Sequence, residues 1–305
     1  MIKDDDKKDL LEISILQKLQ MQLTNYLKLL RLNQPTGIWL LFLPCLFGIF
    51  LAFKKLPESS LADIQPAIIF FFIGSIIMRS AGCVINDLFD QKFDEKVTRT
   101  RNRPLASKAI SRRNALILLT SLLLLGLVIL LQFNLKTILS GFAALALVIT
   151  YPLMKRITYY PQVFLGLTFN FGIIMASFAL LDRVYPETLI LYCASIIWTV
   201  IYDTIYAYQD IEDDLQIGVK STAIKFQKNP KKILISLSLG MFLSLILMGW
   251  QGNFKSGFFL TILVAALLLN NKIKKCDFTN SQNCLRIFKD NIWIGILILG
   301  AIILG

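Results

Sequence analysis

Long apolar runs separated by short charged segments make up most of this chain. Runs of about 20 residues are long enough to cross a bilayer as helices, and the pattern predicts nine of them. They lie at 36–53, 64–85, 115–132, 135–151, 161–181, 187–208, 232–250, 255–270 and 289–305. Because the pairs within 115–151 and 232–270 are separated by only a few polar residues, eight or ten spans also fit the pattern. The predicted fold class is all-α, a polytopic membrane protein with a nine-transmembrane-helix bundle.

Composition supports this prediction and extends it to the whole chain. Of the 305 residues, 55% are hydrophobic and only 17% are charged, which is too apolar for an ordinary soluble domain. We therefore expect a single membrane-embedded domain over 1–305. Within it, residues 10–32 mix apolar positions at helical spacing with Lys18, Lys28 and Arg31. This predicts an interfacial helix in an N-terminal segment, 1–35, that lies on the membrane surface.

The loops differ strongly in positive charge. Of the 32 Lys and Arg residues, 26 fall in loops on one predicted side, five fall on the other side, and Arg79 lies inside a span. The positive-inside rule then places the N-terminus in the cytoplasm and the C-terminus outside. The N-terminal residues resemble neither a signal peptide nor an organellar transit peptide, so we expect a multi-pass protein of a bacterial cell inner membrane with a periplasmic C-terminus. Basic loops beside anionic lipid account for the net charge of +12, so no nucleic-acid partner is predicted.

Two acidic motifs stand at the cytoplasmic ends of predicted spans. In the first, Asn86, Asp87, Asp90 and Asp94 fall on one stripe of a helix. In the second, Asp203, Asp210 and Asp214 lie at positions i, i+7 and i+11 of another helix. If the two helices face each other, seven acidic side chains could converge and would repel one another unless cations hold them. These are Asp87, Asp90, Asp94, Asp210, Glu212, Asp213 and Asp214.

Two charges lie deeper, inside the predicted spans. Arg79 precedes Asn86 by seven residues and Asp203 precedes Asp210 by seven, which places each about 10 Å further into the membrane. A charge there costs at least ~2–3 kcal/mol, so both side chains are expected to face a cavity. The mouth of this cavity is also ringed by basic residues. These are Arg99, Arg101, Arg103, Lys108, Lys155, Arg156, Lys220 and Lys225.

Acidic and basic groups together favour a diphosphate site over a cation path. Carboxylates suit a hard divalent cation, and Arg and Lys beside that cation would bind phosphate oxygens. The chain has no His, which excludes Ser-His, Cys-His and His-zinc mechanisms and leaves carboxylates, Lys, Arg, Tyr and a bound metal. The alternative from another class is a membrane cation carrier, which would use the same acids without chemistry.

At this point the motifs show a family resemblance. The stretch RSAGCVINDLFDQKFDEKVTRTRNRPL at 79–105 and the stretch YDTIYAYQDIEDDLQIGVKSTAIK at 202–225 resemble the two signatures of the UbiA superfamily of intramembrane prenyltransferases. The signatures are NDxxDxxxD and YDxxYAxxDxxDDxxxGxKST. Together with YPLMKR, these stretches are similar to the branch that prenylates 4-hydroxybenzoate in ubiquinone synthesis. One departure is Asn33 in RLNQPTG, where the family usually has an acidic residue.

The resemblance implies a reaction and the residues that carry it. A polyprenyl diphosphate and 4-hydroxybenzoate would be the substrates, and the ring carbon ortho to the hydroxyl would be prenylated. Asp87, Asp90 and Asp94 would hold one Mg²⁺, and Asp210 and Asp214 another. The expected catalytic residues are Asp203, Arg156 and Lys155. The expected substrate-binding residues are Arg79, Asn86, Arg99, Arg103, Lys155, Arg156 and Lys220.

Several alternatives stand beside these roles. Arg79 binds the substrate carboxylate while Asp203 orients or deprotonates the phenol, or the two form a structural salt bridge. Lys155 and Arg156 share the charge of the leaving group, or they anchor a helix end at the membrane surface. The acceptor could also be another aromatic compound, such as homogentisate, a naphthoate or a porphyrin.

Overall fold

The computed structural model describes residues 4–56 and 58–305, and within these ranges all regular structure is helical. Nine helical segments of the described chain are long and apolar enough to cross a membrane, which confirms the predicted bundle. In two of these spans a pair of helices follows end to end, α6 with α7 and α8 with α9. The helices are α1 (Asp4–Leu29), α2 (Thr36–Phe53), α3 (Leu61–Asp94), α4 (Arg112–Leu130), α5 (Leu135–Ile157), α6 (Pro161–Phe169), α7 (Gly172–Leu181), α8 (Pro186–Ala207), α9 (Ile211–Ile217), α10 (Thr222–Lys225), α11 (Pro230–Gln251), α12 (Ser256–Lys275) and α13 (Ser281–Leu304).

Local sequence sets many of the helix starts. The side chains of Ser111 and Asn134 accept hydrogen bonds from the third residue of α4 and of α5, at 3.2 and 2.9 Å. These bonds satisfy N–H groups that have no partner inside the helix. Proline begins α6, α8 and α11, where its missing N–H costs nothing. The short polar segments between spans therefore contain the signals that divide the chain into helices.

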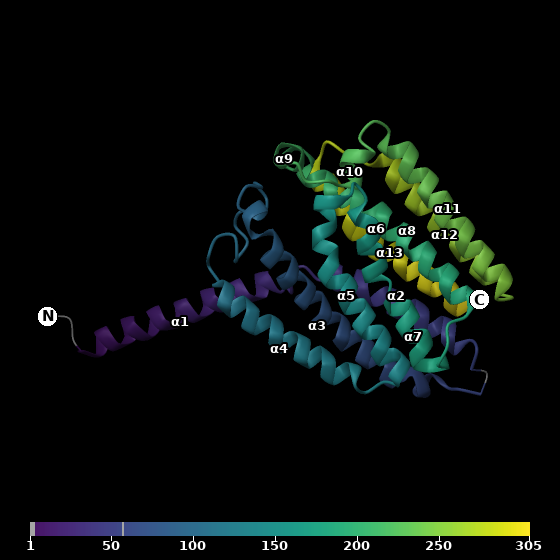
Figure 1. Ribbon diagram of the computed structural model, residues 1–305, viewed down its shortest axis with the longest axis horizontal. Helices are drawn as coiled ribbons and strands as arrows, with labels where there is room; N and C mark the ends of the chain where they lie inside the picture. The colour runs from purple at the N-terminus through teal and green to yellow at the C-terminus, as the bar shows by residue number, and fades with distance from the viewer. Residues whose placement is uncertain (1–3, 57) are drawn as a thin grey trace.

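The core of the bundle lies where α2, α8, α11 and α13 meet. Trp198 of α8 is 1% exposed and packs between Phe47 of α2 and Tyr202. Its indole N–H donates to Asn291 of α13 at 3.0 Å, so a large apolar side chain is buried without leaving its one polar group unpaired. Figure 1 shows α11 and α12 on the side of the bundle away from α1 and α4.

Two predicted helices are interrupted. The predicted span 161–181 breaks at Asn170, whose side-chain amide donates to the Gly166 carbonyl and to Thr199, each at 2.8 Å. The second interruption corrects the sequence analysis, because Asp203, Asp210 and Asp214 do not share one continuous helix. After α8 the chain makes a short 3₁₀ turn at Tyr208–Asp210, and α9 then begins anew. Helical spacing alone therefore misplaces Asp214 relative to Asp203.

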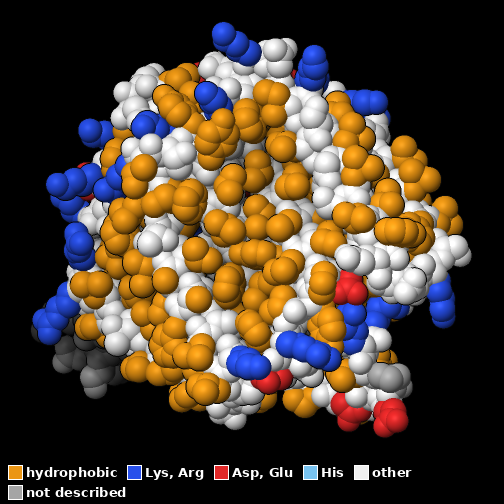
Figure 2. Space-filling model, turned by 45° about the vertical axis from the view of Figure 1, so that its right-hand side comes forward, with side chains coloured by type: hydrophobic (Ala, Val, Ile, Leu, Met, Phe, Trp, Pro, Cys, Tyr) orange, Lys and Arg blue, Asp and Glu red, His pale blue; other side chains and the backbone are white. Residues whose placement is uncertain are grey.

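The outer surface is apolar, as a lipid-facing bundle requires. Figure 2 shows hydrophobic side chains across the broad middle of the molecule, with Lys and Arg mostly towards its edges. Large apolar side chains such as Leu124, Leu243, Trp250 and Trp293 are more than half exposed. An exposed area of this kind is expected only where lipid or another protein covers it.

Helix α1 projects from the bundle (Figure 1). Leu29 at its end is fully buried against Ala81 and Val84 of α3, whereas Leu16 and Leu19 are exposed. The contact at Leu29 fixes where α1 joins the bundle. The interfacial position of the rest of α1 stays a prediction.

A close approach of α2 to α7 gives a test of this packing. A Cβ at Gly48 would lie 2.7 Å from the carbonyl oxygen of Ile173, whereas a Cβ at Gly240 in α11 would have nothing within 4 Å. We expect Gly48→Ala to destabilise the protein by about 1–3 kcal/mol. Gly240→Ala should be neutral or stabilising by up to about 1 kcal/mol, since Ala favours helix. Thermal unfolding of both variants in one detergent measures the difference, and equal melting temperatures would contradict the packing.

Candidate active site

The two acidic motifs meet at one end of the bundle, where the loop 95–111 joins them. Asp87 and Asp90 on the last turns of α3 are each 1% exposed. From the loop, the backbone N–H of Thr98 donates to Asp213 at 3.0 Å, and Nε of Arg99 donates to Asp210 at 2.6 Å. The loop thus ties the end of α3 to the segment that follows α8.

Basic side chains separate the carboxylates of the first motif. Arg31 donates from Nη2 to both oxygens of Asp87, at 2.9 and 3.0 Å. Arg103 lies between two acids, with Nη1 3.3 Å from Asp87 and 2.9 Å from Asp94. These ion pairs offset the repulsion between the negatively charged carboxylates. Accordingly, within 4–56 and 58–305 no three acidic or Cys side chains cluster closely enough to form a ready metal site.

Asp90 has a different environment. One of its oxygens pairs with Nζ of Lys155, at the end of α5. The other oxygen, Oδ1, is buried and has no hydrogen-bond partner among the described residues, although Nη2 of Arg156 is 4.0 Å away. An unsatisfied buried carboxylate oxygen is costly. An oxygen donor set of this kind fits a hard divalent cation.

Arg99 and Arg103 of the joining loop stay charged. Burial lowers the pKa of Arg103, but Asp87 and Asp94 raise it further, and the net effect is upward. For Arg99, burial again lowers the pKa, and the bonds to Asp210 and Tyr206 outweigh it. Both guanidinium groups are therefore held as permanent cations beside the acids.

A cavity of about 570 Å³ runs from these motifs into the bundle. Arg79 and Asp203 both line it, and in the described part of the chain they form no ion pair with each other. The Arg79 guanidinium lies between Gly37 of α2, where a Cβ would be 2.4 Å from its Nε, and the ring of Phe169, 5.4 Å from its Cζ. That Nε is buried and has no partner among the described residues. No described residue accepts a hydrogen bond from the Arg79 guanidinium, which lines the cavity while its Nε packs against Gly37.

The deeper cavity wall is apolar and comes from α3, α4 and α5. Gly74 and Met78 of α3, Leu127 of α4, and Leu145 and Val148 of α5 line it. A Cβ at Gly74 would meet nothing within 4 Å. This wall could accommodate a flexible apolar chain.

The predicted site residues fall into three groups. Those that line the cavity are Arg79, Asn86, Asp87, Arg103 and Asp203. Those that form ion pairs at the mouth are Asp90 with Lys155, Asp210 with Arg99, and Asp94 with Arg103 of the first group. Asp214 and Lys220 lie outside these pairs, and Arg156 approaches them only at 4.0 Å, from its Nη2 to Oδ1 of Asp90. Arg156 donates to the Phe89 carbonyl at 2.9 Å, and Nζ of Lys220 donates to the Ile157 carbonyl at 3.1 Å, so both bind helix ends.

Sequence reasoning missed three residues that shape the site. Arg31, with φ of 57°, is in the left-handed region and binds Asp87. Tyr206 accepts a 3.0 Å hydrogen bond from Arg99, and Gly37 makes room for Arg79. Arg31 and Gly37 are the first and last residues of the stretch RLNQPTG, and Tyr206 lies in the second acidic motif. Their position in these stretches was the only sequence signal that they belong to the site.

Similar curated proteins share one name. "4-hydroxybenzoate polyprenyltransferase, mitochondrial" of Homo sapiens is 41% identical over 283 residues, 92% of this chain and 75% of the human protein. The Drosophila pseudoobscura pseudoobscura protein of that name is 40% identical over 295 residues, 96% of this chain and 73% of its own length. The Schizosaccharomyces pombe protein is 42% identical over 283 residues, 92% of this chain and 79% of its own length.

These relatives correct the predicted location. They are named as mitochondrial proteins of eukaryotes, so the prediction of a bacterial inner membrane is wrong, and with it the assignment of a periplasmic C-terminus. The prediction used hydropathy, loop charge and the N-terminal residues. Apolar spans are required in any bilayer, so these properties do not identify the membrane.

Solved structures show the same fold. A UbiA homolog from Aeropyrum pernix K1 has a TM-score of 0.69 and 23% identity, over 87% of this chain and 96% of its own. A UbiA homolog from Archaeoglobus fulgidus bound to GPP and Mg²⁺ has a TM-score of 0.66 and 20% identity, over 92% and 99% of the two chains. The profile of the UbiA prenyltransferase family matches residues 41–297. This chain therefore belongs to the UbiA prenyltransferase family.

Proposed function

We propose that this protein is a Mg²⁺-dependent 4-hydroxybenzoate polyprenyltransferase of ubiquinone synthesis. It transfers the polyprenyl group of polyprenyl diphosphate to the ring carbon ortho to the hydroxyl of 4-hydroxybenzoate. The observation that carries the proposal is one cavity that reaches Asn86, Asp87 and Arg103 beside the acidic motifs, with the unpaired Arg79 guanidinium and an apolar wall further in. The name shared by relatives at about 40% identity supports the same reaction.

The acidic motifs are the proposed metal ligands. Asp87, Asp90 and Asp94 would hold one Mg²⁺ and Asp210 and Asp214 another, and the unsatisfied Oδ1 of Asp90 fits this role. When bound, the ions would neutralise the charge that grows on the diphosphate as the bond from C1 to oxygen breaks. The UbiA homolog from Archaeoglobus fulgidus has been solved bound to GPP and Mg²⁺ and bound to DMAPP and Mg²⁺.

The basic residues at the mouth have two sets of possible partners. Without substrate, Arg99, Arg103 and Lys155 pair with the carboxylates. If Mg²⁺ bound these carboxylates, the same side chains would be free to bind diphosphate oxygens through charge-assisted hydrogen bonds, which are strong. Arg156 and Lys155 would then share the charge of the leaving group, with Asn86 and Lys220 beside them.

The deeper charges suit the aromatic acid. The Arg79 guanidinium, which has no hydrogen-bond partner among the described residues, would donate to the carboxylate of 4-hydroxybenzoate, and Asp203 would orient the phenol or accept its proton. The apolar wall would keep water from the allylic cation until the ring carbon attacks it. The Arg79 donor favours an acceptor with a carboxylate. Homogentisate and naphthoates can also carry one, so the acceptor has to be tested directly.

The reaction and its metal dependence can be tested together. In isolated membranes given 4-hydroxybenzoate, a long prenyl diphosphate and Mg²⁺, the wild type should form the 3-prenyl product. Asp90→Asn and Asp210→Asn should each lose about 10²-fold or more in rate, because each removes charge that stabilises the transition state. Asp182→Asn is the control, since Asp182 lies outside the site and pairs with Lys136.

The outcomes of this experiment differ clearly. Product from another aromatic acid but not from 4-hydroxybenzoate would change the proposed acceptor. No product from any aromatic acid, together with metal flux into sealed vesicles, would support the cation carrier instead. Normal protein levels in all variants are required for either conclusion.

The role of Arg79 can be tested without removing it. Gly37→Ala should push the guanidinium aside and raise KM for 4-hydroxybenzoate roughly 10- to 100-fold, since a bond to a charged group contributes about 1.5–3 kcal/mol. KM for the prenyl diphosphate should not change. Gly82→Ala is the control, because Gly82 lines the same cavity and its Cβ would meet only Val148, at 4.0 Å. Equal effects on both KM values, or loss of folded protein in Arg79→Leu, would favour a structural role.

Gly74 tests the path of the prenyl tail. It lies 13 residues before Asp87, about 20 Å further along α3, and a larger side chain there would enter open space in the cavity. Gly74→Leu should reduce turnover of long prenyl diphosphates by about tenfold or more. The new side chain would compete with the bound tail for the same space, and overfilling of this kind costs about 1–3 kcal/mol. Geranyl diphosphate should react normally. Gly300→Leu is the control, because Gly300 also has open space but does not line the cavity. Equal loss with both donors would exclude this path.

A further inference from the structure

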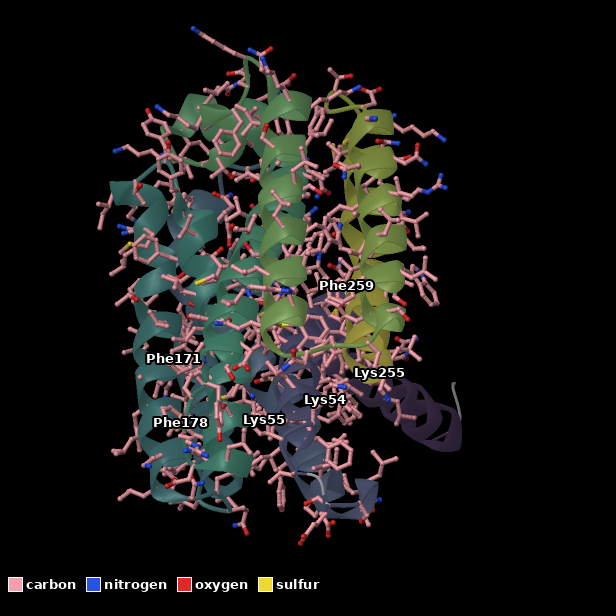
Figure 3. The ribbon with its side chains drawn as sticks, turned by 90° about the vertical axis from the view of Figure 1, so that its right-hand side faces the viewer. Lys54, Lys55, Phe171, Phe178, Lys255 and Phe259 are labelled. Atoms are coloured by element: carbon pink, nitrogen blue, oxygen red, sulfur yellow. The ribbon has the colours of Figure 1, made fainter. Side chains whose placement is uncertain are left out.

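Positive charge is scarce on the side of the bundle opposite the acidic motifs, yet it gathers at one place. The loops of that side contain five basic residues, Lys54, Lys55, Lys136, Arg183 and Lys255. Figure 3 shows Lys55, Lys54 and Lys255 in a row across the end of α2 and the turn between α11 and α12. Lys136 and Arg183 have partners elsewhere, the carboxylate of Asp182 at 2.8 Å and the ring of Tyr185 at 4.6 Å.

A second cavity, of about 340 Å³, opens beside this row, and we refer to it as the far-side pocket. It lies where α2 and α11 end and α8 begins. Lys54, Lys55 and Glu187 supply its charged lining, and Leu51 and Phe254 supply apolar lining. Asn253, Gly252 and Gly305 complete it, and the backbone N–H of Lys255 donates to Gly305 at 3.1 Å.

Charge in the far-side pocket is only partly balanced. Lys55 donates to Oε1 of Glu187 at 3.0 Å. The second oxygen, Oε2, is buried and has no partner among the described residues, and Glu187 as a whole is 8% exposed. Lys54 and Lys255 form no ion pair within the described part of the chain. The ammonium of Lys54 lies 4.8 Å from the ring of Phe254, and both partial burial and repulsion from Lys255 lower its pKa.

Groups of both charges in and beside the pocket therefore lack partners. Lys54 in its lining and Lys255 beside it form no ion pair with a described residue, and Oε2 of Glu187 at its wall lacks a donor. With the carboxylate of Gly305, the last residue of the sequence, two carboxylates face three ammonium groups, those of Lys54, Lys55 and Lys255. Inorganic phosphate would satisfy the lysines and leave Oε2 of Glu187 unpaired, whereas a simple cation would do the reverse. A molecule that carries a phosphate and a protonated amine a few bonds apart satisfies both.

We propose that the far-side pocket binds a phosphate ester with a primary ammonium group, the head group of an aminophospholipid. The phosphate lies at Lys54 and Lys255, and the ammonium donates to Oε2 of Glu187. A lipid is favoured over soluble phosphoethanolamine because the pocket lies where several membrane-spanning helices end, at the level of lipid head groups. Leu51 and Phe254 offer the apolar contact that the start of an acyl chain would need.

The bound head group would join three parts of the bundle. Lys54 follows α2, Glu187 is in the first turn of α8, and Lys255 precedes α12. A ligand that binds only the folded state raises its stability. The proposal concerns a site away from the catalytic cavity and does not depend on the prenyl transfer reaction.

The test is a melting temperature in lipid nanodiscs of defined composition. The full chain is compared in phosphatidylcholine alone and in phosphatidylcholine with added phosphatidylethanolamine or phosphatidylglycerol of the same acyl chains. Phosphatidylethanolamine should raise the melting temperature by about 2–4 °C. Phosphatidylcholine has no N–H to donate and phosphatidylglycerol has no cation, so neither should do so. Soluble phosphoethanolamine added to phosphatidylcholine discs is a further arm, and an equal rise there would overturn the lipid assignment.

Substitutions in the pocket test whether the rise in melting temperature with phosphatidylethanolamine arises there. Glu187→Gln, Lys54→Gln and Lys255→Gln should each abolish the increment due to phosphatidylethanolamine, whatever their own melting temperatures. Lys136→Gln, from the same side of the bundle, should keep it. If Glu187→Gln does not fold, the two lysine variants decide the question, because neither lysine has an ion pair to lose. A rise that is equal in phosphatidylglycerol, or one that survives in the lysine variants, would overturn the proposal.

Discussion

The pairing of carboxylates with basic side chains at one end of the bundle is the interaction on which the rest of the site depends. Asp87 and Asp90 are almost fully buried where α3 leaves the membrane, and uncompensated charge there would be very costly. Arg31, Arg103 and Lys155 supply the compensation. These cations come from the end of α1, from the loop 95–111 and from α5. Balancing the acids therefore also fixes how these separate segments pack.

The same pairing would let the proposed site accept a charged substrate. Four of the five carboxylates that would hold a cation, all but Asp214, are in contact with a side chain that could hold a phosphate. Replacing one set of partners by the other keeps charge balanced at every stage, which matters where water is scarce. Oδ1 of Asp90 is the exception, a buried oxygen for which the described residues provide no partner.

Glycine positions shape the cavity behind these charges. At Gly37 the missing side chain lets the guanidinium of Arg79 lie against α2, and at Gly74 it leaves open space in the apolar wall. Gly48 leaves no open space, because its missing side chain lets α2 and α7 pack in close contact. A membrane bundle gains little from burying apolar groups against one another, so close packing of this kind carries much of its stability.

The sequence by itself determined the helical class and the stripe of acids on α3, and it predicted nine spans while leaving eight or ten open. Each of these depends on local periodicity, and α3 continues unbroken to Asp94. It also determined the family, because two long motifs carry the resemblance. Only the tertiary structure decided that the second motif breaks at Asp210, since an isolated helix pattern contains no signal for the bonds that Arg99 makes with it. The partners of each acid, the free donor of Arg79 and the pocket at Glu187 were likewise decided by contacts between residues far apart in the chain, which spacing along one helix cannot encode.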